Sequence, residues 1–292
     1  MGLMNIFNNL PLPDRKAKLL ELIADDDGAG IATFLENHPE AVKWQTGKPE
    51  QRFLFRAIDD RKYAAVAALM ADGRSHTMLS ASGAPPLLHA LRAAEKGMGP
   101  ATADDLALAG WMVAQGSSVM GKARGGRDFA LCAVDAENIE AVEFLLQRGI
   151  SATPVLRAAA TFEGFLSREF AKELVPVLLR AGADANVTNI HGLTPLFYVQ
   201  DIDTAKALVA HGADPEWGSG SGNPPWKQVK DAETRDYLRQ VVHERVAKRA
   251  GAAMTGDDVL LKEFEKDIDG ACHNNVAVKT AKRIRLKPQG GA

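Results

Sequence analysis

The chain has 292 residues, of which 46% are hydrophobic and only 6% aromatic, and its formal net charge is −2. A nearly neutral chain has no overall electrostatic attraction for nucleic acid or membrane surfaces, and no apolar run approaches the roughly 18 residues of a membrane-spanning helix. The two cysteines, Cys132 and Cys272, lie far apart, which argues against a disulfide framework and for a reducing compartment.

The N-terminal part of the chain predicts an extended lead followed by two short helices. Residues 1–13 lack the basic and apolar regions of a signal peptide. From Asp14 onward, apolar residues recur at helical spacing, and a second apolar helix is expected to end near Asn37. We therefore interpret residues 14–47 as a helical cap, whose outer face must stay solvated.

A recurring stop signal organises residues 48–216. Each apolar helical run ends on a residue that is usually glycine, which suits the left-handed position after a helix because it has no Cβ. The last three intervals between stops are 33, 33 and 30 residues, which indicates a repeated unit of about 33 residues. The stops are His38, Gly73, Gly116, Gly149, Gly182 and Gly212.

The clearest unit runs from Gly182 to Pro215 and both opens and closes with Gly-Ala-Asp. Within it, Thr194 is expected to cap a helix through its hydroxyl. Pro195 would then occupy the first helical position, where no backbone N–H is needed, and Leu196 would begin the buried face. One unit thus predicts a loop, a short inner helix, a turn, a second outer helix and a glycine stop.

This unit resembles the ankyrin repeat, whose consensus reads G-A-D-x-N, then G-x-T-P-L, then L-L-x-x-G-A-D. The resemblance implies an all-α ankyrin-repeat solenoid of stacked helix-turn-helix units, with about five to six repeats and residues 217–250 as the C-terminal capping pair. The matching residues are Gly182, Ala183, Asp184, Asn186, Gly192, Thr194, Pro195 and Leu196.

The other repeats depart from this consensus. Insertions fall at residues 92–104 and 160–172, where they either modulate binding or reflect neutral change at exposed turns. Asp128 is expected to cap the inner helix of the third repeat. Pro176 lies inside an apolar helical pattern, so that helix either starts near Glu173 or kinks at the proline.

No catalytic set emerges from the sequence. A phosphate-binding loop is absent, and the glycine-serine run 218–222 follows a helix end, which makes it a turn and not a nucleophile elbow. Cys272 and His273 lack the further ligands that a zinc site requires, and Cys132 is expected to pack like an alanine. We therefore expect no catalytic residue, no metal and no cofactor.

The last 42 residues, 251–292, have a different character. Residues 259–268 predict a short amphipathic helix, and the end of the chain carries five basic side chains without an acid. This tail is interpreted as a solvated segment, as a strand added to a partner, or as a nuclear-import or RNA-contacting cluster. Its candidate docking residues are Lys282, Arg283 and Arg285.

In ankyrin proteins, partners are contacted mostly through the loop before T-P-L and the exposed side of the first helix. Ile190 stands at the tip of such a loop, which indicates either a binding contact or packing on the neighbouring loop. The implied contact residues are Asn189, Ile190, His191, Leu193 and Asp201 in the fifth repeat, and Arg124, Arg127 and Asp135 in the third.

Two classes of function are compatible with these features. The first is a non-catalytic scaffold or adaptor that binds a protein partner as a monomer, with nucleic acid expected only through the tail. The second is a secreted effector or regulatory enzyme in which the repeats target and the tail acts or docks. Alanine-rich, cysteine-poor, degenerate repeats resemble those of bacterial ankyrin proteins, either cytoplasmic or delivered to another cell.

Overall fold

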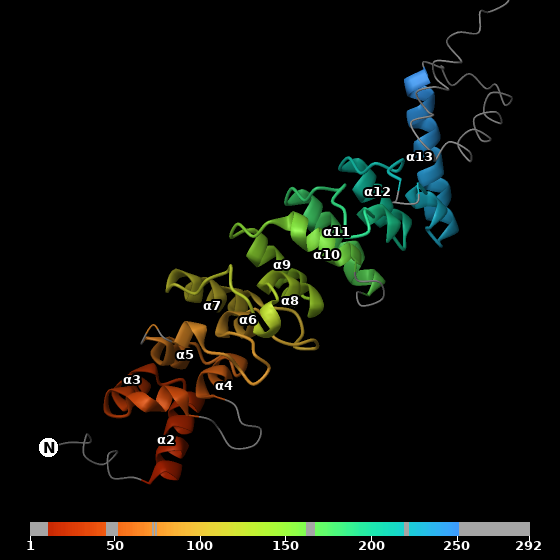
Figure 1. Ribbon diagram of the computed structural model, residues 1–292. Coiled ribbons are helices and arrows are strands. Elements are labelled where there is room, and N and C mark those ends of the chain that lie inside the picture. The colour runs from red at the N-terminus through yellow and green to blue at the C-terminus, as the bar shows by residue number, and fades with distance from the viewer. Residues whose placement is uncertain are drawn as a thin grey trace, which may run out of the picture. The chain divides into compact units, whose positions relative to one another are not determined.

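The computed structural model of the chain describes residues 11–44, 52–71, 73, 75–161, 167–218 and 222–250 (Figure 1). These ranges form helices, 3₁₀ turns and connecting loops, with one isolated bridge between Lys122 and Asp128. The chain divides into two compact units, 1–150 and 151–292, and each is described by itself. The expected helix at 259–268 and the tail residues Lys282, Arg283 and Arg285 lie outside the described residues.

Unit 1 is built from helix pairs, in agreement with the expected all-α fold. Within the described part, α4 packs against α6 and α6 against α8, while α3 packs against α5. The pairs are α2 (Leu12–Ala24) with α3 (Gly28–Asn37), α4 (Phe53–Asp59) with α5 (Tyr63–Met70), α6 (Pro86–Ala90) with α7 (Ala103–Ala114), and α8 (Phe129–Asp135) with α9 (Ile139–Leu146). Single 3₁₀ turns are η1 (Pro39–Lys43), η2 (Ser75–Thr77) and η3 (Arg124–Gly126).

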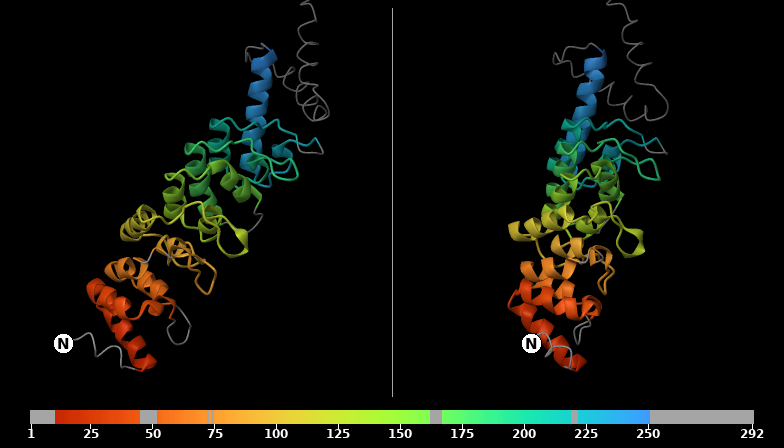
Figure 2. Two further views of the ribbon diagram at one scale, coloured as in Figure 1. Left: turned by 60° about the vertical axis from the view of Figure 1, so that its left-hand side comes forward. Right: turned by 90° about the vertical axis from the view of Figure 1, so that its left-hand side faces the viewer.

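Unit 2 continues the same alternation of inner and outer elements (Figure 2). The outer helix α12 packs against α11 and α13, and the inner turn η4 contacts α10 and η5. None of the described helices of the chain is long and apolar enough to cross a membrane. The pairs are α10 (Ala152–Thr161) with α11 (Arg168–Arg180), η4 (Pro195–Phe197) with α12 (Ile202–Ala210), and η5 (Pro225–Lys227) with α13 (Ala232–Ala250).

Small side chains allow the inner helices of unit 1 to pack closely. The equivalent residues Ala57, Ala90 and Ala133 of α4, α6 and α8 are each at most 1% exposed. A larger side chain at any of them would push neighbouring helices apart, because protein interiors are packed as densely as organic crystals. The high alanine content therefore reflects the short distance between inner helices.

The turns that join inner to outer helices in unit 1 share a left-handed residue with a polar side chain. Asp26, Arg61, Arg92 and Glu137 have φ between +53° and +57°, a conformation that L-residues adopt at a cost of about 1 kcal/mol. Their side chains reach beyond the turn. Asp26 accepts from the backbone N–H of Ala65 at 2.9 Å in the next pair, and Arg92 donates to the carbonyl of Met98 at 2.9 Å in the first insertion.

Arg61 makes the strongest of these contacts. Its guanidinium donates two hydrogen bonds, of 3.0 and 2.9 Å, to the two carboxylate oxygens of Asp105 on the next outer helix, α7. Burial by itself raises the pKa of Asp105, but the hydrogen bonds from Arg61 and Thr102 outweigh it, so the net pKa lies below its ordinary value. The pair therefore holds the turn of the first repeat to the start of α7.

Asn138 has the corresponding role between the second and third repeats. Its side chain is buried and caps α9 by accepting from the backbone N–H of Ala141 at 3.0 Å. Its amide nitrogen lies within hydrogen-bond distance of the carbonyls of Leu91, Arg92 and Gly99, at 3.1, 3.3 and 3.2 Å. The first insertion is thus fastened to the next repeat by the buried amide of Asn138, in addition to the ion pair of 3.1 Å between Lys96 and Glu137.

Two local expectations are corrected by the structure, and one of two alternatives for a third is excluded. Thr194 does not cap through its hydroxyl, because the N–H of Phe197 that it would bind already donates to the carbonyl of Thr194 at 3.0 Å within a 3₁₀ turn. Asp128 makes no capping bond either, and its carboxylate lies 3.9 Å from the Lys122 ammonium. For Pro176, a helix start near Glu173 is excluded, because α11 starts at Arg168, with Ser167 as its cap, and contains the proline.

We expect Asn138→Ala to lower the free energy of unfolding by about 2–3 kcal/mol, since it removes a cap and leaves buried carbonyls without a donor. Urea unfolding followed by circular dichroism measures this. Asn37→Ala is the matched control, because the Asn37 amide bonds only to the carbonyl one turn back, and it should cost less than about 0.5 kcal/mol. Equal losses of stability in the two variants would contradict the proposal that Asn138 holds the first insertion to the third repeat.

The lowered pKa of Asp105 predicts a pH-dependent contribution to stability. The carboxylate stabilises the fold above the unfolded-state pKa of about 4, and this contribution disappears as pH falls through the lower folded-state pKa. Asp105→Asn should therefore cost about 2 kcal/mol at neutral pH and clearly less near pH 3. The exposed neighbour Asp104, changed to Asn, provides the control, and a difference that stays constant with pH would refute the assignment.

Candidate partner-binding pocket

The fifth and sixth repeats have shortened inner segments. In the third repeat, ten positions separate the inner N-cap Asp128 from the outer N-cap Asn138. In the fifth repeat only seven positions separate Thr194 from Asp201, and in the sixth seven separate Pro224 from Asp231. The outer segments keep their length, since eleven positions lead from Asn138 to Gly149 and from Asp201 to Gly212.

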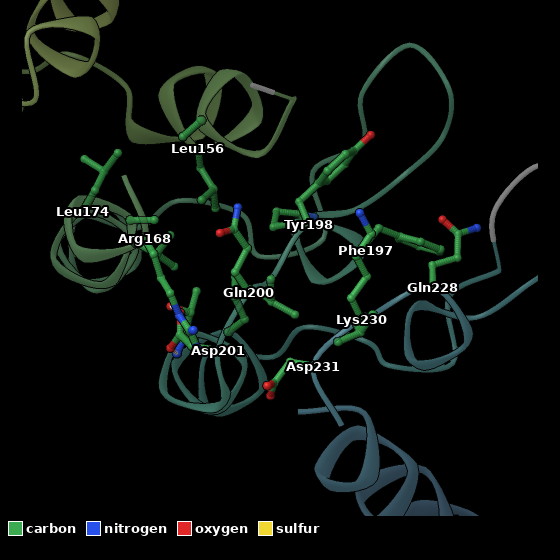
Figure 3. A pocket seen from close by; sticks show the side chains of 18 residues that line it. Leu156, Arg168, Leu174, Phe197, Tyr198, Gln200, Asp201, Gln228, Lys230 and Asp231 are labelled. Carbon is green, nitrogen blue, oxygen red and sulfur yellow. Dashed lines mark hydrogen bonds between the residues drawn. The ribbon is translucent and has the colours of Figure 1, made fainter. Parts of the chain in front are cut away.

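The shortening replaces two inner helices by single 3₁₀ turns and leaves a hollow beside them. A pocket of about 940 Å³ opens in unit 2, between α10, the start of α11, η4 and the segment before α13 (Figure 3). We refer to it as the inner pocket. Its apolar lining is Leu156, Ala159, Ala171, Leu174, Val175, Pro195, Phe197, Val199, Leu208 and Val229. Its polar lining is Arg168, Tyr198, Gln200, Asp201, Thr204, Gln228, Lys230 and Asp231.

Four polar residues of this lining are exposed and form the rim of the inner pocket. They are Arg168, Gln200, Gln228 and Lys230. The apolar floor is mostly closed to solvent, and Phe197 and Val199 are 7% and 8% exposed. An apolar floor with a few convergent polar groups is the usual composition of a binding site in proteins.

The two carboxylates in the pocket cap the outer helices. Asp201 accepts from both the backbone N–H and the hydroxyl of Thr204, each at 2.9 Å. Asp231 also accepts from the backbone N–H and the hydroxyl of Thr234, at 2.9 and 2.6 Å, but both of these bonds go to its Oδ2. These bonds from Thr234, together with the positive charge of Arg168, lower the pKa of Asp231.

Asp201, which we expected among the partner contacts, lies in the lining of the inner pocket. It is only 3% exposed, and both of its oxygens accept hydrogen bonds from Thr204, so its carboxylate acts as a helix cap. The physical reason is the shortened inner segment, which brings residue 201 directly to the N-terminus of α12. At that position an aspartate satisfies free backbone N–H groups of the helix.

Asn189 closes the loop that precedes η4. Its side-chain oxygen accepts from the backbone N–H groups of His191 and Leu193, at 2.9 and 3.0 Å. Its side-chain nitrogen donates to the hydroxyl of Tyr198 at 2.7 Å, and Tyr198 lines the inner pocket. Asn189 is half-buried, so it shapes the loop and ties it to the pocket.

Ile190 is the exposed tip of this loop. It is 94% exposed, the highest value among the large apolar side chains of the described residues, so it does not pack on the neighbouring loop. His191 is also exposed, whereas Leu193 is half-buried. Gly192 follows with φ +72°, a conformation in which a Cβ is strained.

Asn186 links the loops of the fifth and sixth repeats at their base. Its amide nitrogen donates to the carbonyl of Gly212 at 2.9 Å, and its oxygen accepts from the N–H of Asp214 at 2.7 Å. The two loops lie side by side in both views of Figure 2. The Asn of the G-A-D-x-N motif thus holds one loop to the start of the next.

The candidate contacts of the third repeat lie in unit 1. Arg127 and Asp135 form an ion pair, and each side chain is 41% exposed. Burial raises the pKa of Asp135, an effect that Arg127 partly offsets. Arg124 belongs to the turn η3, and its side chain is not among those described. Cys132 is half-buried, and burial raises the pKa of its thiol, which disfavours the reactive thiolate.

Sequence reasoning missed the rim residues Arg168, Gln200, Gln228 and Lys230. The available signal was the interval of 30 residues between Gly182 and Gly212, which marks a shortened repeat. The interval alone does not show which of the two helices lost residues. Among the described residues, no cluster of three or more His, Cys, Asp or Glu side chains is placed to hold a metal ion.

Comparison with known proteins identifies the fold. The chain resembles the ankyrin repeat domain of human ASB11, with a TM-score of 0.51 and 18% sequence identity, over 76% of this chain and 96% of that one. No protein-family model and no curated protein sequence matches the chain. The likeness at this identity shows an ankyrin-repeat fold, in agreement with the helix pairs and turns described above.

We expect Asn189→Ala to loosen the loop and detach it from Tyr198, because three side-chain hydrogen bonds are lost. Backbone N–H groups of residues 190–193 should then exchange with deuterium at least about tenfold faster, equivalent to a loss of about 1.4 kcal/mol of local stability. His191→Ala is the control, since the Asn189 side chain binds the backbone of residue 191. Unchanged exchange in Asn189→Ala would show that the loop is held by other contacts.

Proposed function

We propose that this ankyrin-repeat chain is a non-catalytic scaffold that binds a short extended segment of a protein partner in the inner pocket, assisted by the loop 189–193. The observation that carries the proposal is the shortening of two consecutive inner segments, which opens a pocket of about 940 Å³. This volume lies near the upper end of the roughly 300–1,000 Å³ typical of ligand sites.

The backbone beside the pocket supports an extended ligand. Asp201 has an extended conformation, with φ −154° and ψ 156°. The backbone N–H groups of Val199 and Gln200, which precede it, donate to no other described residue. A peptide in extended conformation can pair with such free groups, as in the binding modes that add a strand to an exposed backbone.

The loop tip adds an apolar contact next to this backbone. Ile190 is 94% exposed, and the hydrogen bond from Asn189 to Tyr198 fixes its loop to the pocket wall. A fully exposed isoleucine gains free energy when a partner covers it, at roughly 25 cal/mol per Å² of apolar surface. We therefore propose that Ile190, His191 and the pocket contact the same partner.

The chemistry of the pocket favours binding over catalysis. The lining includes no His, Cys or Ser, so the usual nucleophiles and the usual general base are missing from it. Asp201 and Asp231 serve as helix caps and are hydrogen bonded to Thr204 and Thr234. The side chains that remain available are suited to holding a peptide.

We also propose that the chain acts as a monomer in a reducing compartment such as a cytoplasm. Cys132 is a free thiol, and burial raises its pKa, which is compatible with a compartment that keeps thiols reduced. Sedimentation of the purified chain across a range of concentrations tests the monomer, and a dimer at low micromolar concentration would refute it.

A photo-crosslinking amino acid at Gln228 identifies the partner, and titration with the purified partner then measures its affinity. Gln200→Trp should weaken binding at least about tenfold because an indole at the rim blocks the pocket, and Ile190→Ser should weaken it several-fold. Met120→Ser, on an exposed apolar residue of unit 1, is the control and should leave affinity unchanged.

Circular dichroism and thermal unfolding check that these variants fold. If Gln200→Trp and Ile190→Ser bind the purified partner as well as the unmodified chain does, the inner pocket and its loop are not the binding site. A crosslink from Gln228 that maps to a structured surface, and not to a linear segment of the partner, would contradict the extended ligand.

A further inference from the structure

We infer that the inner pocket selects a partner segment in which apolar and acidic side chains alternate. This inference rests on the proposed function and specifies its ligand. The choice of ligand depends on which charged side chains of the pocket are free to bind it, and on the apolar residues that form the floor of the pocket.

The available charges at the rim are positive. Arg168 and Lys230 line the pocket and are both exposed (Figure 3). They come from different elements, since Arg168 opens α11 and Lys230 precedes α13. Two cations on separate elements can bind acidic side chains at two points along a ligand. They therefore select a negatively charged ligand and also fix its position in the pocket.

The negative charges in the pocket belong to the two helix caps. Asp201 is buried and both of its oxygens accept from Thr204, whereas Asp231 is half-buried and accepts both bonds from Thr234 at its Oδ2. Each carboxylate also faces the positive end of its own helix dipole, which offsets its charge. An acidic ligand is therefore attracted by Arg168 and Lys230 more strongly than it is repelled by the two aspartates.

Arg168 occupies a position at which an acidic ligand is favoured. It is the first residue of α11, and a cation at a helix N-terminus is unfavourable because it adds to the positive end of the dipole. The attraction between Arg168 and Asp231 offsets part of this cost. An acidic side chain bound between Arg168 and the start of α11 would interact favourably with both.

The floor requires apolar side chains. Leu156, Leu174, Phe197 and Val199 lie below the rim and would bury matching apolar groups of the ligand. In an extended peptide successive side chains point to opposite sides, so every second residue can face the floor while its neighbours stay near the rim. A ligand in which apolar and acidic residues alternate can therefore contact the apolar floor and the positively charged rim at the same time.

The same charges argue against the chain's own basic end as the occupant. Lys282, Arg283 and Arg285 are like-charged with Arg168 and Lys230. Like charges brought together at a rim disfavour the complex. The inner pocket is therefore assigned to a segment of another protein.

Three pools of fluorescein-labelled nonapeptides test the inference on the full chain. Each pool alternates mixed Leu, Ile, Phe and Val with one polar residue, which is Glu, Gln or Lys. By fluorescence anisotropy, the Glu pool should bind at least about tenfold more tightly than the Gln pool, and the Lys pool most weakly. The preference for Glu should decrease when the salt concentration is raised, because the rim cations are exposed.

Variants at the rim decide whether these two cations are responsible. Lys230→Glu and Arg168→Glu should each abolish the preference for the Glu pool, and the double variant should prefer the Lys pool. Lys248→Glu is the matched control, because Lys248 is exposed on α13, is absent from the pocket lining, and gives the same change in net charge. Lys248→Glu should keep the original preference.

The outcomes separate this inference from the proposed function. A preference for the Lys pool, or a preference for Glu that survives the double variant, overturns the inference. If the pools bind equally and Gln200→Trp abolishes all binding, the acidic ligand is refuted while the pocket function stands. If no pool binds, the inference is also overturned, and the crosslink from Gln228 then decides separately whether the pocket binds a partner.

Discussion

A helix pair of this chain cannot bury its own apolar face, so the fold depends on the register between consecutive pairs. Apolar packing supplies most of the free energy, but it does not determine how far one pair is shifted along the next. Polar side chains at the turns and outer-helix N-termini fix that shift within each unit. Arg61 with Asp105 and the buried amide of Asn138 act in unit 1, and Asn186 acts in unit 2.

This constraint explains where the repeats can change length. The outer segment keeps eleven positions from cap to stop in both the third and the fifth repeats. In the third repeat its N-cap Asn138 binds the preceding repeat, and in the fifth its stop Gly212 accepts a hydrogen bond from Asn186. The inner segment is shorter by three residues in the fifth and sixth repeats. Loss of inner residues therefore leaves the stack of outer helices intact and opens a pocket on the inner side.

The pocket in turn decides which side chains are available for recognition. Shortening brings Asp201 and Asp231 to the starts of α12 and α13, where they become caps. It leaves Gln200, Gln228 and Lys230 on the exposed rim, beside backbone N–H groups of Val199 and Gln200 that donate to no other described residue. The exposed tip at Ile190 is held next to this surface through Asn189 and Tyr198. Structural capping and ligand binding are thus divided between adjacent residues of the same short segments.

The sequence by itself determined the type of fold, the helix pairs, and the positions of the glycine stops and the first insertion. Each of these follows from local chemistry, such as the left-handed glycines Gly182 and Gly212 or the proline at the start of η4. Only the tertiary structure decided that Asp201 is a cap, that Thr194 is not, and that Arg168 and Lys230 share a pocket. The physical reason is that these roles depend on distances between repeats, and the inner shortening changes those distances without changing the local pattern.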